Sequence, residues 1–146
     1  MSAQSIPVRL NGGQVTASWW NLLLYMFGAG ALYETSQTLS NNASATAVTG
    51  VTCDSASYRT MTVEYDVYRK TDTAASEVRA TGKVVLVWSV QNSSWSIKGE
   101  DFIGDAHGIT WTLTGTTVAQ LNYATTNIAG ANYVGKLNTR ASTFNL

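Results

Sequence analysis

Residues 58–70, which read YRTMTVEYDVYRK, carry the clearest structural signal in the sequence. Polar and apolar side chains alternate from Thr60 to Val67. Because successive side chains of a β-strand point to opposite faces, this alternation predicts a strand with one face against a core. The buried side is predicted to carry Met61, Val63, Tyr65 and Val67.

The same two-residue period continues on both sides of this strand. Turns rich in Asn, Ser, Thr and Gly separate the apolar stretches. Eight strands at roughly ten-residue spacing predict an all-β domain over residues 31–146, an antiparallel β-sandwich with jelly-roll-like character. Besides the first stretch, the predicted strands are residues 32–39, 46–53, 76–90, 95–103, 109–114, 118–126 and 133–144.

One predicted strand differs from the others in pattern. Its centre, VVLVW at residues 84–88, is apolar on both faces rather than on one. A strand of this kind is typical of a central position in a sheet that is covered on both sides. We therefore expect both of its faces to be covered.

The region before the β-domain divides into two segments. Residues 1–15 form a predicted extended arm, in which Pro7 favours an edge position and Ile6, Val8 and Leu10 alternate. Residues 16–30, with the run WWNLLLYMF at 19–27, predict one short helix that is apolar on nearly every face. Such a helix must be surrounded on all sides.

Three environments could surround this helix. A bilayer span needs about 20 apolar residues, more than this run provides. A secretory signal would explain Ala29-Gly30-Ala31, but eighteen residues with a single Arg precede the apolar run. We therefore favour a protein environment, against a sheet or at a subunit interface. The candidate interface residues are Ile6, Val8, Leu10, Trp19, Trp20, Leu23, Tyr25 and Phe27.

Composition narrows the classes of function. The chain has 146 residues, enough for one domain, and nine Lys and Arg balance nine Asp and Glu. With no net charge, neither nucleic acid nor a membrane surface is an expected partner. Only 12% of residues are charged, which suits a surface covered by neighbouring subunits. One Cys and one His exclude an internal disulfide, a cysteine zinc site and a multi-histidine centre, and we expect no cofactor.

The segment 98–108 contains the strongest candidates for chemistry. Glu100, Asp101, Asp105 and His107 lie within eight residues and could hold a calcium ion or a transition metal. Their spacing matches no EF-hand loop, so we favour a solvated connection and predict no metal site. Whether these four residues bind an ion stays open at this point.

Other reactive patterns are weaker. Glu64 and Asp66 share one strand face, but nothing places two carboxylates across a sugar, and surface pairing with Arg is favoured. Cys53 is interpreted as a structural thiol. Trp88, Trp95 and Trp111 are interpreted as packing residues, although Trp95, Tyr58 and Tyr123 could stack on sugars if they were exposed.

The opening of the chain resembles a known family. Residues 8–21, VRLNGGQVTASWWN, are similar to the openings of tailed-bacteriophage tail-fibre and related virion proteins. In those proteins a short strand, a turn and a T-A-S-W-x-N helix start precede a β-rich domain. The resemblance implies a virion structural protein, commonly a homotrimer, with no catalytic residues to transfer. The chain departs from typical fibres because it has no long repetitive or coiled-coil shaft.

From these observations we predict a non-enzymatic phage virion protein, a tail-fibre, appendage or adaptor subunit that forms a homo-oligomer, with a trimer as the expected number. Its partners are predicted to be itself and other virion proteins. One alternative is a host-attachment tip that binds surface glycan through residues 91–94, 101–108 and 126–132. A capsid-decoration protein is another, and a polysaccharide hydrolase is a remote one.

Overall fold

The computed structural model describes residues 33–73 and 76–145. Every element of this part of the chain is a β-strand. The eight strands are β1 (Tyr33–Thr38), β2 (Thr46–Asp54), β3 (Tyr58–Lys70), β4 (Val78–Ser89), β5 (Ser94–Gly104), β6 (Ile109–Thr114), β7 (Val118–Thr125) and β8 (Val134–Asn145). The eight predicted strands are confirmed, each within two residues at either end.

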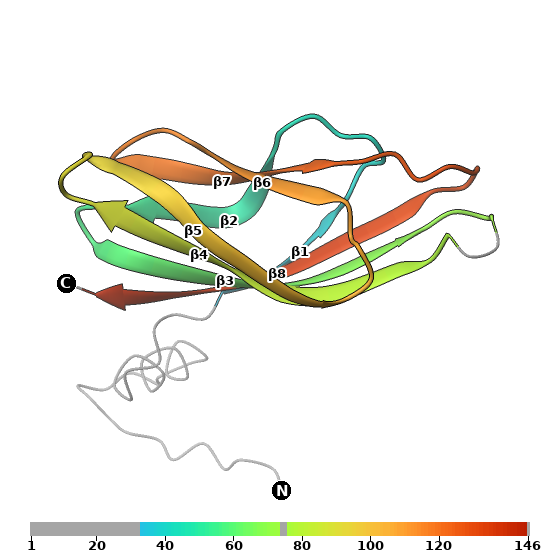
Figure 1. The fold of residues 1–146 in the computed structure, drawn as a ribbon, viewed down its shortest axis with the longest axis horizontal. Coiled ribbons are helices and arrows are strands. Elements are labelled where there is room, and N and C mark those ends of the chain that lie inside the picture. The colour runs from blue at the N-terminus through green and yellow to red at the C-terminus, as the bar shows by residue number, and fades with distance from the viewer. Residues whose placement is uncertain (1–32, 74–75, 146) are drawn as a thin grey trace, which may run out of the picture. The chain divides into compact units, whose positions relative to one another are not determined.

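The strands form two antiparallel sheets that lie as two layers (Figure 1). The larger sheet has five strands in the order β1-β8-β3-β4-β5, and the smaller has three in the order β2-β7-β6. In the larger sheet β8 returns beside β3 after β6 and β7 have passed through the other sheet. This is a Greek-key order, in which a fourth strand lies beside the first of three consecutive strands. The all-β, antiparallel fold class is therefore confirmed.

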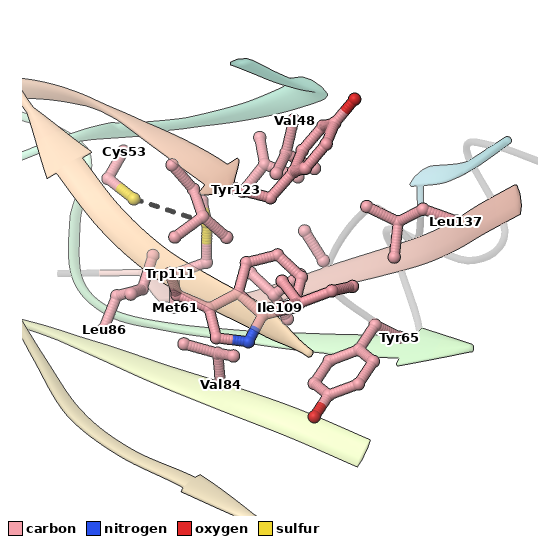
Figure 2. Packing of buried hydrophobic residues seen from close by; sticks show 14 of the residues in the cluster. Val48, Cys53, Met61, Tyr65, Val84, Leu86, Ile109, Trp111, Tyr123 and Leu137 are labelled. Atoms are coloured by element: carbon pink, nitrogen blue, oxygen red, sulfur yellow. Dashed lines mark hydrogen bonds between the residues drawn. The ribbon is translucent and has the colours of Figure 1, made fainter. Parts of the chain in front are cut away.

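The core lies between the two layers, and the alternating residues of β3 form much of it. Met61, Val63, Tyr65 and Val67 are each at most 4% exposed, as the period of two predicts. Figure 2 shows Met61, Val84 and Leu86 of the larger sheet facing side chains of the smaller one, among them Val48 and Tyr123. Burial of this apolar area at about 25 cal/mol per Å² is the main force that holds the layers together.

The structure corrects the expectation for residues 84–88. Val84 and Leu86 are fully buried in the core, but Val85 and Val87 point to the opposite side of β4 and are half-buried. Among the described residues, nothing covers the side of the five-stranded sheet that faces away from the core. We call this side the outer face. The prediction that this strand is covered on both faces was therefore wrong for the part of the chain that the structure describes.

The predicted arm at residues 1–15, the predicted helix at 16–30 and all eight candidate interface residues lie outside the described residues. These expectations stay predictions. Within residues 33–73 and 76–145, the structure contains no helix that could cross a membrane.

Candidate functional site

Four polar and aromatic side chains meet at the side of the domain where β5 and β6 form the edges of their sheets. Oε1 of Glu100 on β5 accepts hydrogen bonds from the Tyr65 hydroxyl of β3 at 2.6 Å and from Trp111 Nε1 of β6 at 2.6 Å. His107 Nε2, in the β5–β6 connection, lies 3.1 Å from the same oxygen. We call these four residues the carboxylate cluster. Because the donors come from both sheets, the cluster ties the two layers together.

A β-bulge explains why a glutamate lies on the inner side of β5. Val85 pairs with Gly99 and Leu86 pairs with Ile97, so Lys98 has no partner in the ladder. An extra residue of this kind shifts the alternation of the strand. Ile97 and Glu100 therefore both face inward, and Asp101 faces outward.

His107 is held as a neutral imidazole by its hydrogen bonds. Its Nδ1 accepts from the Ile109 backbone N–H at 3.1 Å, so the ring proton is on Nε2. That N–H is directed at Glu100 Oε1 and at the Tyr65 oxygen, which is 3.2 Å away. The ring is 4% exposed and has the edge-on neighbour Phe102, with ring centroids 4.5 Å apart. A group fixed in this way holds a proton rather than accepts one.

The ionisation of the cluster follows from its burial. Burial lowers the pKa of His107 below its ordinary value of 6.5, and this effect outweighs the opposing attraction of Glu100; the Arg69 charge lowers the pKa further. Burial, together with the hydrogen bond to Glu100, raises the pKa of Tyr65. At neutral pH the cluster thus combines a neutral imidazole with a protonated phenol.

The lowered pKa of His107 makes stability depend on acidity. The unfolded chain takes up the histidine proton at a higher pH than the folded chain, so stability is full above about pH 6.5 and falls below it until the folded pKa is passed. We expect the free energy of unfolding, measured by urea titration, to decrease from about pH 7.5 to about pH 5. In His107→Gln, whose amide can still donate to Glu100, the decrease should be smaller. An equal decrease in both proteins would contradict this role of His107.

A second group surrounds Arg69, which ends the inner row of β3 and is 1% exposed. Its guanidinium donates to the His107 carbonyl at 2.7 Å, to the Thr126 carbonyl, to Asn41 Oδ1 at 3.4 Å and to the Tyr133 hydroxyl at 3.0 Å. These acceptors lie outside the strands, in the connections between them. Arg69 therefore fixes the loops at one end of the domain, including the loop that carries His107.

The structure brings together only part of the predicted ion site. Glu100 and His107 are in contact, whereas Asp101 lies on the outer face and Asp105 Oδ2 accepts from the Arg79 backbone N–H at 2.9 Å. Among the described residues, no three His, Cys, Asp or Glu side chains are placed to share a metal ion. The four residues that lie close together in the sequence are therefore separated into three places in the fold.

The other candidate residues are mainly core residues. Trp95 and Trp111 are 6% and 8% exposed, and Tyr123 is 2% exposed, so none of the three offers a face to a sugar. Tyr58 and Trp88 are half-buried and pack against the core. Cys53 is fully buried, and burial raises the pKa of its thiol to about 12, which agrees with a structural thiol.

The outer face carries a shallow depression of about 230 Å³. Arg140 is part of it, with guanidinium nitrogens 3.8 Å from Glu34 Oε2 and 4.0 Å from Glu64 Oε2. Its polar lining offers donors and acceptors side by side, and the two carboxylates of β3, Glu64 and Asp66, belong to it. The lining residues are Glu34, Glu64, Tyr65, Asp66, Thr81, Asn138, Thr139 and Arg140.

Arg69 was not among the predicted site residues, although the alternation along β3 contains a signal for it. Met61, Val63, Tyr65 and Val67 define the buried row of β3, and the next member of that row is residue 69. An arginine at an inward position is a sign of a buried guanidinium with several acceptors. The roles of Tyr65 and Trp111 had no such signal, because both are ordinary core residues in the pattern.

Comparison with known proteins gives a distant structural likeness. No family model matches the sequence, and no curated protein does. The tailspike protein of Acinetobacter phage vB_ApiP_P1 matches with a TM-score of 0.45 and 11% identity, over 97% of this chain and 25% of that one. The tailspike protein of Acinetobacter baumannii phage AM24 matches with a TM-score of 0.33 and 14% identity, over 79% and 26%. The chain thus spans about a quarter of either tailspike, and we rest no part of the functional proposal on these likenesses.

Proposed function

We propose that the chain is a non-enzymatic structural subunit of a tailed-phage virion, a tail-fibre, appendage or adaptor protein that assembles as a homo-oligomer. The observation that supports the structural role is that the reactive side chains of the domain are engaged in hydrogen bonds with one another and with the loops. One carboxylate oxygen of Glu100 receives three donors, both ring nitrogens of His107 are engaged, and the Arg69 guanidinium is shared among several loops. These groups hold the two layers and the loops in place.

The virion assignment rests on the opening of the chain. Residues 8–21 resemble the openings of tail-fibre and related virion proteins, and the overlapping run at 19–27 contains no charged residue. The helix predicted at residues 16–30 would have no polar face, and neighbouring subunits that cover it would stabilise it. A capsid-decoration role is compatible with the same features, and a homotrimer is the number that the resemblance implies.

The proposed assembly is tested by removing the two largest side chains of this run. We expect Trp19→Ser combined with Trp20→Ser to dissociate the homo-oligomer, because the apolar area that the two indoles bury would be lost. Light scattering of the purified full chain measures the effect as a fall in mass. Asn21→Ser, a polar replacement in the same run, is the matched control and should keep the wild-type mass. An unchanged mass in the double variant would reject this interface.

One observation favours a second candidate, a glycan-binding tip. The depression on the outer face combines a guanidinium, an amide, hydroxyls and carboxylates, which are groups that can form paired hydrogen bonds with sugar hydroxyls. The predicted glycan-binding loops support this candidate less. Residues 101–108 and 126–132 lie together, since the Thr126 N–H donates to the Gly108 carbonyl at 2.9 Å, whereas residues 91–94, at the turn from β4 into β5, lie at the other end of the domain (Figure 1).

A binding assay distinguishes the two candidates. We expect the full chain to retain no glycan on an array of host surface polysaccharides. Binding that is lost in Arg140→Ala, and kept in the Arg79→Ala control outside the depression, would replace the structural role with the glycan-binding one. Release of reducing sugar from the same polysaccharides, abolished by Glu100→Gln or Asp105→Asn, would overturn the prediction that the chain is not an enzyme.

A further inference from the structure

The outer face of the five-stranded sheet is a broad surface with apolar side chains on it. Ile103 of β5 is 78% exposed and Phe144 of β8 is 71% exposed, and Val85 and Val87 lie between them on β4. The valines belong to the stretch whose pattern is typical of a strand covered on both faces. The charged residues Lys83 and Asp101 lie between Ile103 and Val85 on this face, so a surface that packs here must match both apolar and charged side chains.

Charged side chains cross the same face in one row. The strand register places Glu34, Arg140, Glu64, Lys83 and Asp101 next to one another on β1, β8, β3, β4 and β5. The sign of the charge alternates along this row from each residue to the next. Neighbours of opposite sign stabilise a sheet, so pairing within the chain accounts for part of the pattern.

We propose that a second copy of this chain packs face to face on the outer face, about a two-fold axis that runs parallel to the strands midway between β3 and β4. This operation places β3 opposite β4 of the second copy and β8 opposite its β5. Glu64 then faces Lys83 of the other copy, and Arg140 faces its Asp101. Two-fold symmetry repeats each contact, so four pairs of opposite charge form and the row contains no pair of like charge.

The neighbouring rows fit the same axis. Ile103 faces Asn138 of the second copy and Thr60 faces its Val87, while Phe144 faces its Ser96. Tyr68, on which Arg79 of the same chain already stacks at 4.6 Å, faces the second copy's Arg79. The rows of Ile103 and of Phe144 bring no two charges of one sign together, whereas the Tyr68 row brings the two Arg79 guanidiniums to the same ring.

The size of the surface is sufficient for a stable contact. β8, β3, β4 and β5 have 12, 13, 12 and 11 residues, and the axis lies at the centre of these four long strands. Strands about 4.8 Å apart with a rise of about 3.3 Å per residue give a patch of roughly 19 by 36 Å. Covering it on both copies removes roughly 1,400 Å² from solvent, within the range of about 1,200–2,000 Å² for specific interfaces.

Other axes fit less well. An axis along β3 itself would place Glu64 opposite Glu64 and Arg140 opposite Lys83, which are contacts of like charge. An axis between β8 and β3 keeps opposite charges together but leaves Ile103 and Val87 uncovered, because β1 has only six residues and β5 would have no strand opposite it. Of these axes, the one between β3 and β4 keeps opposite charges together and also covers Ile103, Val87 and Phe144.

This interface does not depend on the proposed function, because it is built from the described strands alone and not from residues 19–27. If the N-terminal run also holds a homo-oligomer, the face-to-face interface would join two such homo-oligomers into an assembly of twice the mass. The face-to-face interface would also cover the depression around Arg140, so glycan binding there and this contact exclude each other.

The test is a mixing experiment with two charge reversals in the full chain. Glu64→Lys alone places lysine opposite Lys83 of the second copy, and Lys83→Glu alone places glutamate opposite Glu64. We expect sedimentation to show half the wild-type mass for each variant alone and the wild-type mass for an equimolar mixture. In each mixed pair the introduced lysine faces the introduced glutamate, and the reciprocal contact joins Lys83 of one copy to Glu64 of the other. Pairing within one chain cannot be restored by mixing.

Two controls complete the design. Glu34→Lys reverses a charge in the same row on β1, outside the four long strands β8, β3, β4 and β5, and it should keep the wild-type mass. Urea unfolding should show that all three variants fold, since Glu64 and Glu34 have side chains that are 62% and 72% exposed. The proposal is overturned if the single variants keep the wild-type mass or if their mixture fails to regain it. It is also overturned if the wild-type mass is not twice the mass of the single variants.

Discussion

Replacing Arg69 with methionine is expected to lower the free energy of unfolding by about 3 kcal/mol. Methionine fills the aliphatic part of the site but offers no donor. The carbonyls of His107 and Thr126 and the side chain of Asn41 would then lose a charged donor inside the domain. Among the described residues the acceptors of the guanidinium are all neutral, so removing it also removes the cost of burying its charge, which offsets part of this loss.

Urea titration followed by tryptophan fluorescence measures this effect. Arg79→Met is the matched control, since Arg79 lies on the next strand and its side chain is 70% exposed. It should leave the free energy of unfolding close to the wild-type value, because an exposed ion pair contributes little. Arg69→Lys should retain part of the lost stability, because an ammonium can serve some of the acceptors but lacks the planar fork. Equal effects of the two methionine variants would show that Arg69 does not organise the loops.

Replacing Gly104 with alanine is expected to cost a similar amount, about 3 kcal/mol, through the backbone. Gly104 ends β5 with a φ of 116°, a conformation that residues with a side chain rarely adopt. A Cβ at this position would overlap the Arg79 carbonyl oxygen and come within 3.0 Å of the Ala80 Cα. Both obstacles are backbone atoms of the neighbouring strand, so they cannot rotate away.

The same strand supplies the control for this prediction. A Cβ at Gly99 would meet nothing within 4 Å, and Gly99 has no unusual φ. Gly99→Ala should therefore be neutral or stabilising by about 0.5 kcal/mol, because alanine loses less backbone freedom on folding. Thermal or urea unfolding of both variants gives the comparison. If Gly104→Ala unfolds like Gly99→Ala, the tight turn from β5 toward His107 is not required for stability.

The strands were predictable because one physical rule determines them. Each strand has one face against the core, and the period of two records that burial directly, as in β3 and β6. The rule also states which residues of β3 are inside, up to and including Arg69. It does not state what an inward arginine bonds, since its acceptors come from loops far away in the sequence.

The candidate site was less predictable, and the reason is local. Continuing the alternation from Trp95 and Ile97 would place Asp101 and Ile103 on the core side of β5. The bulge at Lys98 reverses this, so Glu100 lies on the core side and Asp101 lies on the outer face. A bulge is set by the pairing with β4, which a single strand's sequence does not display. The ion-site hypothesis therefore joined residues that the sheet separates onto opposite faces.

The prediction that residues 84–88 are covered on both faces differs from the structure for another reason. The pattern indicated apolar surroundings on both sides, whereas the described part of the chain supplies them on one side. If the second side is covered by another copy, the pattern was reporting the assembly and not the single domain. The pattern of residues 84–88 would then reflect both packing within the domain and packing between copies.

The most direct test of the structural role is the mass of the wild-type full chain in solution, measured by light scattering over a range of concentrations. The proposal predicts a discrete multiple of 15.7 kDa that persists on dilution into the micromolar range. A stable species of 15.7 kDa at every concentration would contradict it, because a subunit built to be covered by its neighbours would then exist alone.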